Sequence, residues 1–165
     1  PVSVLGIRDA VVAASPDGIL VASKEESPKI KELMAGHNAI PMYEERYWGS
    51  YKVLDYSNFS NHQVITRHVK IDTGKHLSYQ YHKYRKENWT VIQGEGILII
   101  DENIQVIRQG DVIQINENQK HAVKAIKELQ IIEVQQGLNL NEEDVNRLEK
   151  NWEAIEDMCF SKATN

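Results

Sequence analysis

The chain has one cysteine, Cys159, among its 165 residues, so it cannot form an internal disulfide. This scarcity is typical of a reducing cytoplasm, where we expect the protein to reside. No histidine-bearing motif accompanies the thiol, which favours a buried or idle cysteine over a nucleophile. The sequence also lacks an apolar run long enough to cross a bilayer, so we expect no membrane partner. A net charge of −5 without a basic stripe argues against nucleic acid as a partner.

What the sequence does contain is typical of a globular protein. Apolar residues make up 41% and charged residues 26% of the chain, and the length suits one domain with an appendage. We predict a β/α arm over residues 1–40, with a hairpin through the Pro16-Asp17-Gly18 turn and then a helix over residues 23–34. The arm has too little apolar surface for a core of its own, so we expect it to pack on something else.

Residues 41–156 are predicted to form the main domain, which is mainly β. Short apolar segments follow one another, separated by turn residues, and no helical period runs through them. This spacing indicates a β-sandwich or barrel. The predicted strands are Val64–Ile71, Leu77–His82, Trp89–Gln93, Gly96–Ile100, Ile104–Ile107, Val112–Ile115, Ala122–Ile126 and Leu129–Val134.

Two segments flank these strands. Three aromatic residues surround a glycine over residues 46–51, and two interpretations stay open: an aromatic plug under the barrel, or a substrate-facing Arg46 or Trp48. A C-terminal helix is predicted over residues 138–156, capped at Asn141 and complemented by acidic residues in its first turn. Residues 157–165 are predicted to be a frayed, flexible tail.

Four side chains of ligand type are candidates for a metal site: Gln80, His82, Glu87 and His121. Gln80 and His82 are two apart and face the same side of a strand, while Glu87 follows a short polar loop. Imidazole, carboxylate and amide groups suit a borderline divalent ion, Zn2+ foremost, with Mn2+, Fe2+ or Ni2+ still open. Each residue alone would equally be an ordinary hydrogen-bonded polar group.

Their spacing relative to glycines strengthens the metal hypothesis and introduces a resemblance. The pattern Gly74-x5-Gln80-x-His82-x4-Glu87-x6-Gly94, with Gly110-x10-His121, is similar to the paired motifs of the cupin superfamily. Glutamine at the first position resembles the type II mannose-6-phosphate isomerase cupins. Arg46-Tyr-Trp-Gly-Ser-Tyr51 likewise resembles that family's Arg-Pro-Trp-Gly-Ser-Tyr. The resemblance implies a double-stranded β-helix, or jelly-roll, barrel, and commonly a homodimer.

The arm carries a second resemblance. Residues 2–24 are similar to the end of the catalytic domain of mannose-1-phosphate guanylyltransferases, whose bifunctional members continue into such a cupin. The chain is therefore expected to be the C-terminal part of a longer enzyme of GDP-mannose metabolism. The glycine-rich nucleotide-binding loop of that domain is not in this sequence, so the resemblance implies no guanylyl transfer by this chain alone.

For the cupin domain, the resemblance implies that Gln80, His82, Glu87 and His121 hold a divalent metal and that the substrate is a small sugar phosphate. Arg67 and Lys86 are candidates for contacting the phosphate, with solvated surface charge as the other interpretation. The family usually ends its last helix in Tyr-Gly-Arg, whereas this chain has Trp152-Glu-Ala154. That departure keeps a second hypothesis open, a non-catalytic cupin that binds a sugar or mediates dimerisation.

Overall fold

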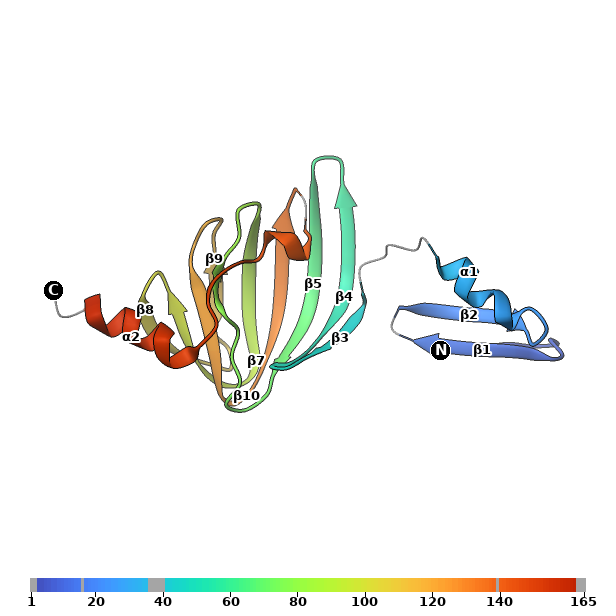
Figure 1. The fold of residues 1–165 in the computed structure, drawn as a ribbon, viewed down its shortest axis with the longest axis horizontal. Coiled ribbons are helices and arrows are strands. Elements are labelled where there is room, and N and C mark those ends of the chain that lie inside the picture. The colour runs from blue at the N-terminus through green and yellow to red at the C-terminus, as the bar shows by residue number, and fades with distance from the viewer. Residues whose placement is uncertain (1–2, 16, 36–40, 139, 163–165) are drawn as a thin grey trace. The chain divides into compact units, whose positions relative to one another are not determined.

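The computed structural model describes residues 3–15, 17–35, 41–138 and 140–162 (Figure 1). The chain divides into two compact units, Pro1–Tyr43 and Glu44–Asn165, close to the division predicted at residue 41. Within the described part of the chain, no helix is both long and apolar enough to cross a bilayer.

The first unit is a β-hairpin followed by a short helical segment. The predicted hairpin is confirmed: β1 (Ala10–Ser15) and β2 (Gly18–Ser23) are antiparallel, with Ser15 opposite Gly18. The helix is shorter than predicted, because only η1 (Ser27–Lys29) and α1 (Ile30–Met34) are helical. Among the described residues from 3 to 35, none is buried, as expected for a unit too small to enclose a core.

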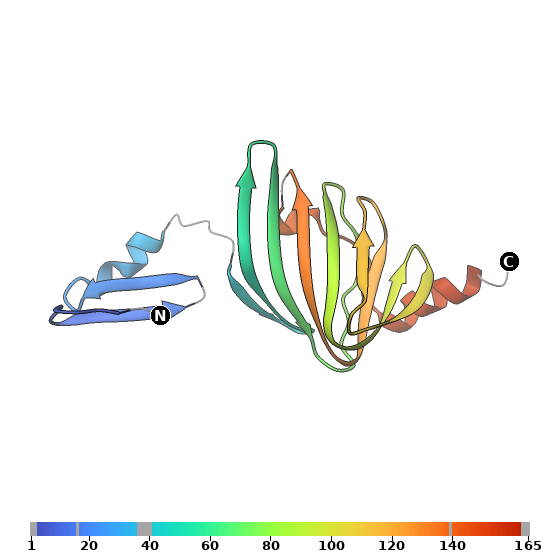
Figure 2. The same cartoon turned by 180° about the vertical axis from the view of Figure 1, so that it is seen from behind.

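The second unit confirms the prediction of a mainly β domain. Nine strands of its described residues form one curved sheet (Figures 1 and 2). They are β3 (Tyr43–Arg46), β4 (Gly49–Phe59), β5 (His62–Ile71), β6 (Tyr79–Tyr81), β7 (Arg85–Ile100), β8 (Asn103–Arg108), β9 (Val112–Ile115), β10 (His121–Gly137) and β11 (Asn146–Glu149).

Two long strands, β7 and β10, are the central strands of this sheet. They pair with each other along most of their length, while β10 also pairs with β5 and β6, and β7 with β8 and β9. Each was predicted as two separate strands. The turn predicted at Gly94 is wrong, because the chain passes through Gly94 at φ 90° and continues pairing across register shifts in β10. A Cβ at Gly94 would overlap the carbonyl oxygen of Glu128, so glycine is required at this irregularity.

The segment before residue 62 was not predicted as strand. Its apolar and polar residues do not alternate cleanly, but β4 pairs with β5 from Gly49 to Phe59, with one register shift between Val53 and Asp55, and buries Tyr51 and Val53. Pairing with β5, whose Ile65, Val69 and Ile71 are buried, stabilises an extended conformation that the local residue pattern does not predict.

The helix predicted over residues 138–156 is wrong in its first part. The chain there forms η2 (Glu142–Asp144) and β11, which pairs with β6, and only then α2 (Trp152–Lys162). Asn151 begins α2, because its side-chain oxygen accepts a hydrogen bond from the backbone N–H of Ala154. The tail predicted from residue 157 is helical as far as Lys162.

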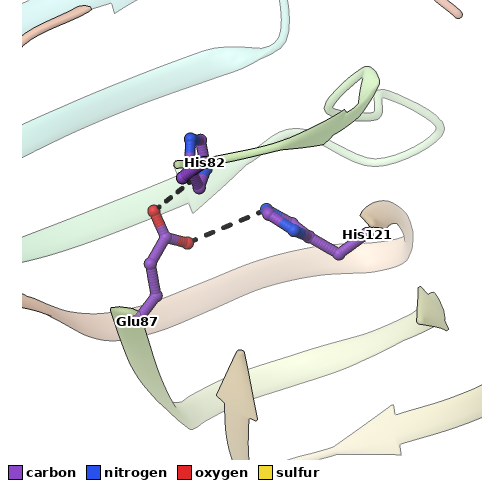
Figure 3. Close-up of side chains that lie close together, drawn as sticks. All are labelled: His82, Glu87 and His121. Carbon is purple, nitrogen blue, oxygen red and sulfur yellow. Dashed lines mark ion pairs between the residues drawn. The ribbon is translucent and has the colours of Figure 1, made fainter. Parts of the chain in front are cut away.

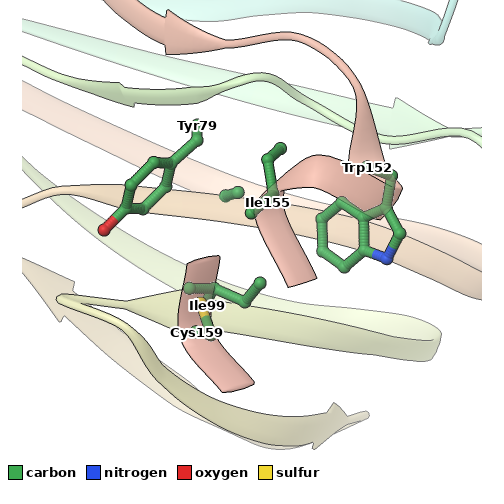
Figure 4. Packing of buried hydrophobic residues seen from close by; sticks show 6 residues of the cluster. Tyr79, Ile99, Trp152, Ile155 and Cys159 are labelled. Atoms are coloured by element: carbon green, nitrogen blue, oxygen red, sulfur yellow. The ribbon is translucent and has the colours of Figure 1, made fainter. Parts of the chain in front are cut away.

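Helix α2 packs on the barrel through one apolar cluster (Figure 4). Trp152, Ile155 and Cys159 of the helix contact Tyr79 of β6 and Ile99 of β7. The thiol is buried, in agreement with its predicted structural place. Complete burial of Ile155 and near-complete burial of Trp152 dock the helix by the hydrophobic effect.

Candidate metal site and adjoining cavity

Three strands bring the predicted ligand residues together. Gln80 lies in β6, His82 directly follows it, Glu87 lies near the start of β7, and His121 begins β10. His121 is opposite Gln80 in the β10–β6 pairing, so residues far apart in sequence become neighbours. Figure 3 shows the side chains of His82, Glu87 and His121 converging, with the carboxylate between the two imidazoles.

The His82, Glu87 and His121 cluster is tight and buried. Nε2 of His82 lies 3.3 Å from Oε1 of Glu87, and Nε2 of His121 lies 3.9 Å from Oε2. One nitrogen or oxygen of each of the three residues lies within 4.8 Å of those of the other two. Their side chains are 1% to 3% exposed. Two imidazoles and one carboxylate at this spacing can hold one divalent ion.

Backbone carbonyl groups fix the orientation of both imidazoles. Nδ1 of His82 lies 3.0 Å from the carbonyl oxygen of Asp144, and Nδ1 of His121 lies 3.0 Å from that of Gln119. A carbonyl can only accept, so each Nδ1 carries the proton and each Nε2 presents its lone pair to Glu87. Nε2 of His121 is buried and has no hydrogen-bond partner among the described residues. This arrangement suits a metal ligand.

The protonation states favour metal binding as well. Burial, with smaller contributions from Arg85 and His121, lowers the pKa of His82 to about 4, although Glu87 opposes this shift. Burial also lowers the pKa of His121. Burial alone would raise the pKa of Glu87, but the two imidazoles and the Arg85 guanidinium outweigh it and lower the pKa. Neutral imidazoles and an ionised carboxylate are the forms that ligate metals.

Gln80 lies beside this cluster rather than inside it. Its side chain is only partly buried, and its Oε1 accepts a hydrogen bond from the Ser78 hydroxyl at 2.9 Å. Gln80 lines the same cavity as Glu87. The structure therefore places the amide within the site's surroundings, and its role as a fourth ligand stays a prediction.

Arg85 is a site residue that the sequence reasoning missed. Its Nη2 lies 3.0 Å from Nδ1 and 3.4 Å from Nε2 of His82, so the guanidinium lies across the face of the ring. Its Nε lies 3.3 Å from Glu87, and Nη1 donates to Gln135 at 3.3 Å. The signal was present in the sequence, because Arg85 and Glu87 are two apart on one strand and must share a face.

Asp144 was also missed as a site residue, having been assigned to the first turn of a helix. Its carboxylate accepts hydrogen bonds from the backbone N–H groups of Lys83 and Tyr84 at 2.9 and 3.1 Å. Its own carbonyl orients His82. One buried aspartate thus fixes both the loop that follows His82 and the direction of the imidazole.

A cavity of about 150 Å3 adjoins the cluster. Its wall contains four of the chain's six arginines, Arg46, Arg67, Arg85 and Arg147, facing two carboxylates. The wall is therefore cationic although the whole chain is acidic. The other lining residues are Tyr47, Trp48, Tyr51, Val69, Leu77, Ser78, Gln80, Glu87, Trp89, Glu133, Gln135 and Val145.

The two candidates for phosphate contact, Arg67 and Lys86, line different depressions of the structure. Arg67 is buried in this wall with its guanidinium 4.5 Å above the ring of Tyr51. Lys86 alternates with the inward-facing Arg85 and Glu87, is exposed, and lines a different depression together with His62 and Tyr84. Arg46 and Trp48, for which two interpretations were open, also line the cavity.

The comparisons with known proteins agree with this architecture. The family model for the mannose-6-phosphate isomerase C-terminal domain matches residues 34–150. Alginate biosynthesis protein AlgA of Pseudomonas aeruginosa is 32% identical over 90% of this chain, and mannose-1-phosphate guanylyltransferase RfbM of Salmonella typhimurium is 27% identical over 90%. The chain spans about a third of the length of these curated relatives, 32% of each.

Solved structures confirm the fold class. A cupin-2 domain from Rhodospirillum rubrum is similar with a TM-score of 0.50 and 14% identity, over 69% of this chain and 71% of that one. The capsular polysaccharide assembling protein CapF of Staphylococcus aureus matches with a TM-score of 0.53 and 13% identity, over 68% of this chain and 35% of that one. The predicted cupin double-stranded β-helix is thus confirmed.

Proposed function

Because the chain belongs to the mannose-6-phosphate isomerase C-terminal domain family, we propose that its cavity binds a divalent metal and a sugar phosphate and interconverts the aldose and ketose forms. The observation that carries this proposal is the meeting of two features in one place. A buried cluster of two imidazoles and a carboxylate adjoins a wall that contains four of the six arginines.

The metal is proposed to be held by Nε2 of His82, Nε2 of His121 and the carboxylate of Glu87, with Gln80 as a fourth ligand. Zn2+ suits this donor set best, and Mn2+, Fe2+ or Ni2+ are alternatives. A bound divalent ion supplies Lewis-acid polarisation of a sugar oxygen. The orphaned Nε2 of His121 and the fixed tautomers of both imidazoles support this assignment.

The arginines are proposed to bind the phosphate group. A guanidinium presents several N–H donors in one plane, which matches phosphate oxygens better than a lysine does. Arg67 is held by Tyr51, and Arg147 lies in β11 opposite Gln80, so they approach the cavity from different strands. The exposed Lys86 lines another depression and is not positioned to bind a phosphate in this cavity.

The alternative is a cupin that binds the sugar phosphate without converting it. Ala154, where the family usually has arginine, favours this alternative. The complete set of candidate ligands, Gln80, His82, Glu87 and His121, favours catalysis instead. The C-terminal segment still contributes one arginine, Arg147, to the cavity wall. For the whole protein we propose a role in GDP-mannose metabolism, because one relative is named a mannose-1-phosphate guanylyltransferase and this chain spans 32% of its length. From the family resemblance and the scarcity of cysteine, we further propose a cytoplasmic homodimer to which this chain contributes the C-terminal part.

A coupled isomerase assay tests the proposal. The purified protein is loaded with Zn2+ or Mn2+ and given mannose 6-phosphate, and fructose 6-phosphate is measured. We expect turnover with the metal and none with chelator. His82→Ala and His121→Ala should lose both metal content and turnover. His68→Ala is the control, because His68 contacts Gln130 instead of the cluster. Bound metal and bound sugar phosphate without turnover would establish the non-catalytic alternative.

A further inference from the structure

One carboxylate in the cavity wall has no part in the metal cluster. Glu133 lies in the second half of β10, with Arg67 opposite it on β5 and Trp89 opposite it on β7. It is 8% exposed and lines the cavity. A carboxylate so deep in a barrel is costly unless its surroundings compensate for lost hydration, so its place calls for a role.

The amide group of Gln135 connects Glu133 with the metal cluster. Its Nε2 donates to Oε2 of Glu133 at 2.9 Å and lies 3.3 Å from Oε1 of Glu87. The amide therefore bridges two glutamates that line the same cavity in different environments. Glu87 contacts two imidazoles and Arg85, whereas Glu133 is opposite Arg67 in the β10–β5 pairing. Two neighbouring carboxylates in unlike surroundings are suited to different chemical roles.

The environment of Glu133 prepares it to both accept and release a proton. Burial and the nearby charge of Glu87 raise its pKa to about 7, although Arg67 and Arg85 oppose this shift. A buried carboxylate that lines the cavity beside the metal cluster can act as a base in one half of a reaction and as an acid in the other half.

We propose that Glu133 is the catalytic residue that moves the proton between C2 and C1 of the sugar phosphate. This inference rests on the proposed isomerase function. The Glu133 carboxylate takes the proton from C2 of the open-chain aldose. The electrons of the broken C–H bond form the C1–C2 double bond, and the carbonyl electrons move to O1. Glu133 then returns the proton to C1 while the O2 hydroxyl proton passes to O1, which leaves a ketone at C2 and needs no oxidant or reductant.

The other polar groups in the wall are less suited to this transfer. His82 and His121 have their Nδ1–H groups engaged by backbone carbonyls and their Nε2 atoms directed at Glu87. The arginine side chains stay protonated near neutral pH and cannot serve as bases. Among the described residues that line the cavity, Glu87 and Glu133 are the two carboxylates, and Glu87 belongs to the metal cluster.

The test is isomerisation in D2O, followed by NMR. Metal-loaded protein is given mannose 6-phosphate, and both product formation and deuterium incorporation into the sugar carbons are measured. Glu133→Gln preserves size and is expected to lower both rates at least about 100-fold, the usual contribution of a positioned acid–base group. Affinity for Zn2+ and for mannose 6-phosphate, measured by calorimetry, should stay within about threefold. Glu95→Gln, in an exposed ion pair on the same strand as Glu87, is the control and should leave both rates unchanged.

The outcomes separate this proposal from the function on which it rests. An active wild type with an equally active Glu133→Gln variant would overturn the role of Glu133 alone. Loss of metal or sugar-phosphate affinity together with turnover would make Glu133 a structural residue and overturn it too. A wild type that binds both ligands but shows neither turnover nor exchange would overturn the isomerase function as well. If Glu133→Gln does not fold, Glu133→Asp replaces it, and an unchanged exchange rate would then refute the proposal.

Discussion

The raised pKa of Glu133 predicts how the stability of the metal-free protein depends on pH. The carboxyl group has a reference pKa of 4.5, and in the folded protein its pKa is raised to about 7. Below pH 4.5 both states hold the proton. Between these values the unfolded state releases it first, so the folded state loses stability as the pH rises. The difference amounts to about 3 kcal/mol, fully lost above pH 7.

Glu133→Gln removes this titration, so the variant serves as the probe. The free energy of unfolding is measured by urea denaturation with chelator present, at several pH values from about 4.5 to 8. The stability of the variant relative to wild type should rise by about 3 kcal/mol across this range. Glu95→Gln is the matched control: attractive contacts with Lys127 and Arg108 lower the pKa of Glu95, so its relative stability should not rise. A constant difference between Glu133→Gln and wild type would refute the assigned environment.

Two further predictions concern the barrel and the loop after His82. Gly94→Ala should lower the free energy of unfolding by about 3 kcal/mol, because a positive φ is combined there with overlap between the new Cβ and the Glu128 carbonyl. Gly110→Ala, at a positive φ but in open space, is the control and should lower it by about 1–2 kcal/mol. Equal losses of stability in thermal or urea unfolding would contradict the overlap argument. Asp144→Ala should weaken Zn2+ binding about 10- to 100-fold in a chelator competition assay, because loss of the carboxylate releases the loop at Lys83 and Tyr84 that positions His82. Asp111→Ala, which removes a similar carboxylate–backbone bond in an exposed turn, should leave Zn2+ affinity unchanged, and equal weakening by both would point to general destabilisation.

The buried Arg85 guanidinium influences the charge of the metal cluster. Arg85 places a permanent positive charge against His82 and Glu87. That charge helps to keep Glu87 ionised and His82 neutral, which favours ligation, but it also opposes a second positive charge in the same place. The neighbouring Glu133 and the amide of Gln135 lie on the side of the cavity that faces this charge. The balance of charge in the site is therefore set by residues from β7 and β10 together.

The sequence by itself determined the mainly β domain and the short-range part of the site. Strand-length apolar segments separated by turn residues indicated the barrel, and the spacing of two residues placed Gln80 and His82 on one face. Glu87 and His121 were named from their spacing relative to glycines and from the family resemblance. The hairpin of the arm was equally readable, because the Asp17-Gly18 turn has a local physical cause.

Only the tertiary structure decided how distant residues combine. Glu133 has no distinguishing pattern in the sequence, yet strand pairing places it opposite Arg67 in the cavity wall. Residues 146–149 form a strand because β6 offers a partner, which overrides their local helical pattern. Asp144 orients His82 from 62 positions away. Backbone pairing and burial between remote segments set these contacts, and neither is encoded in the pattern of a single segment.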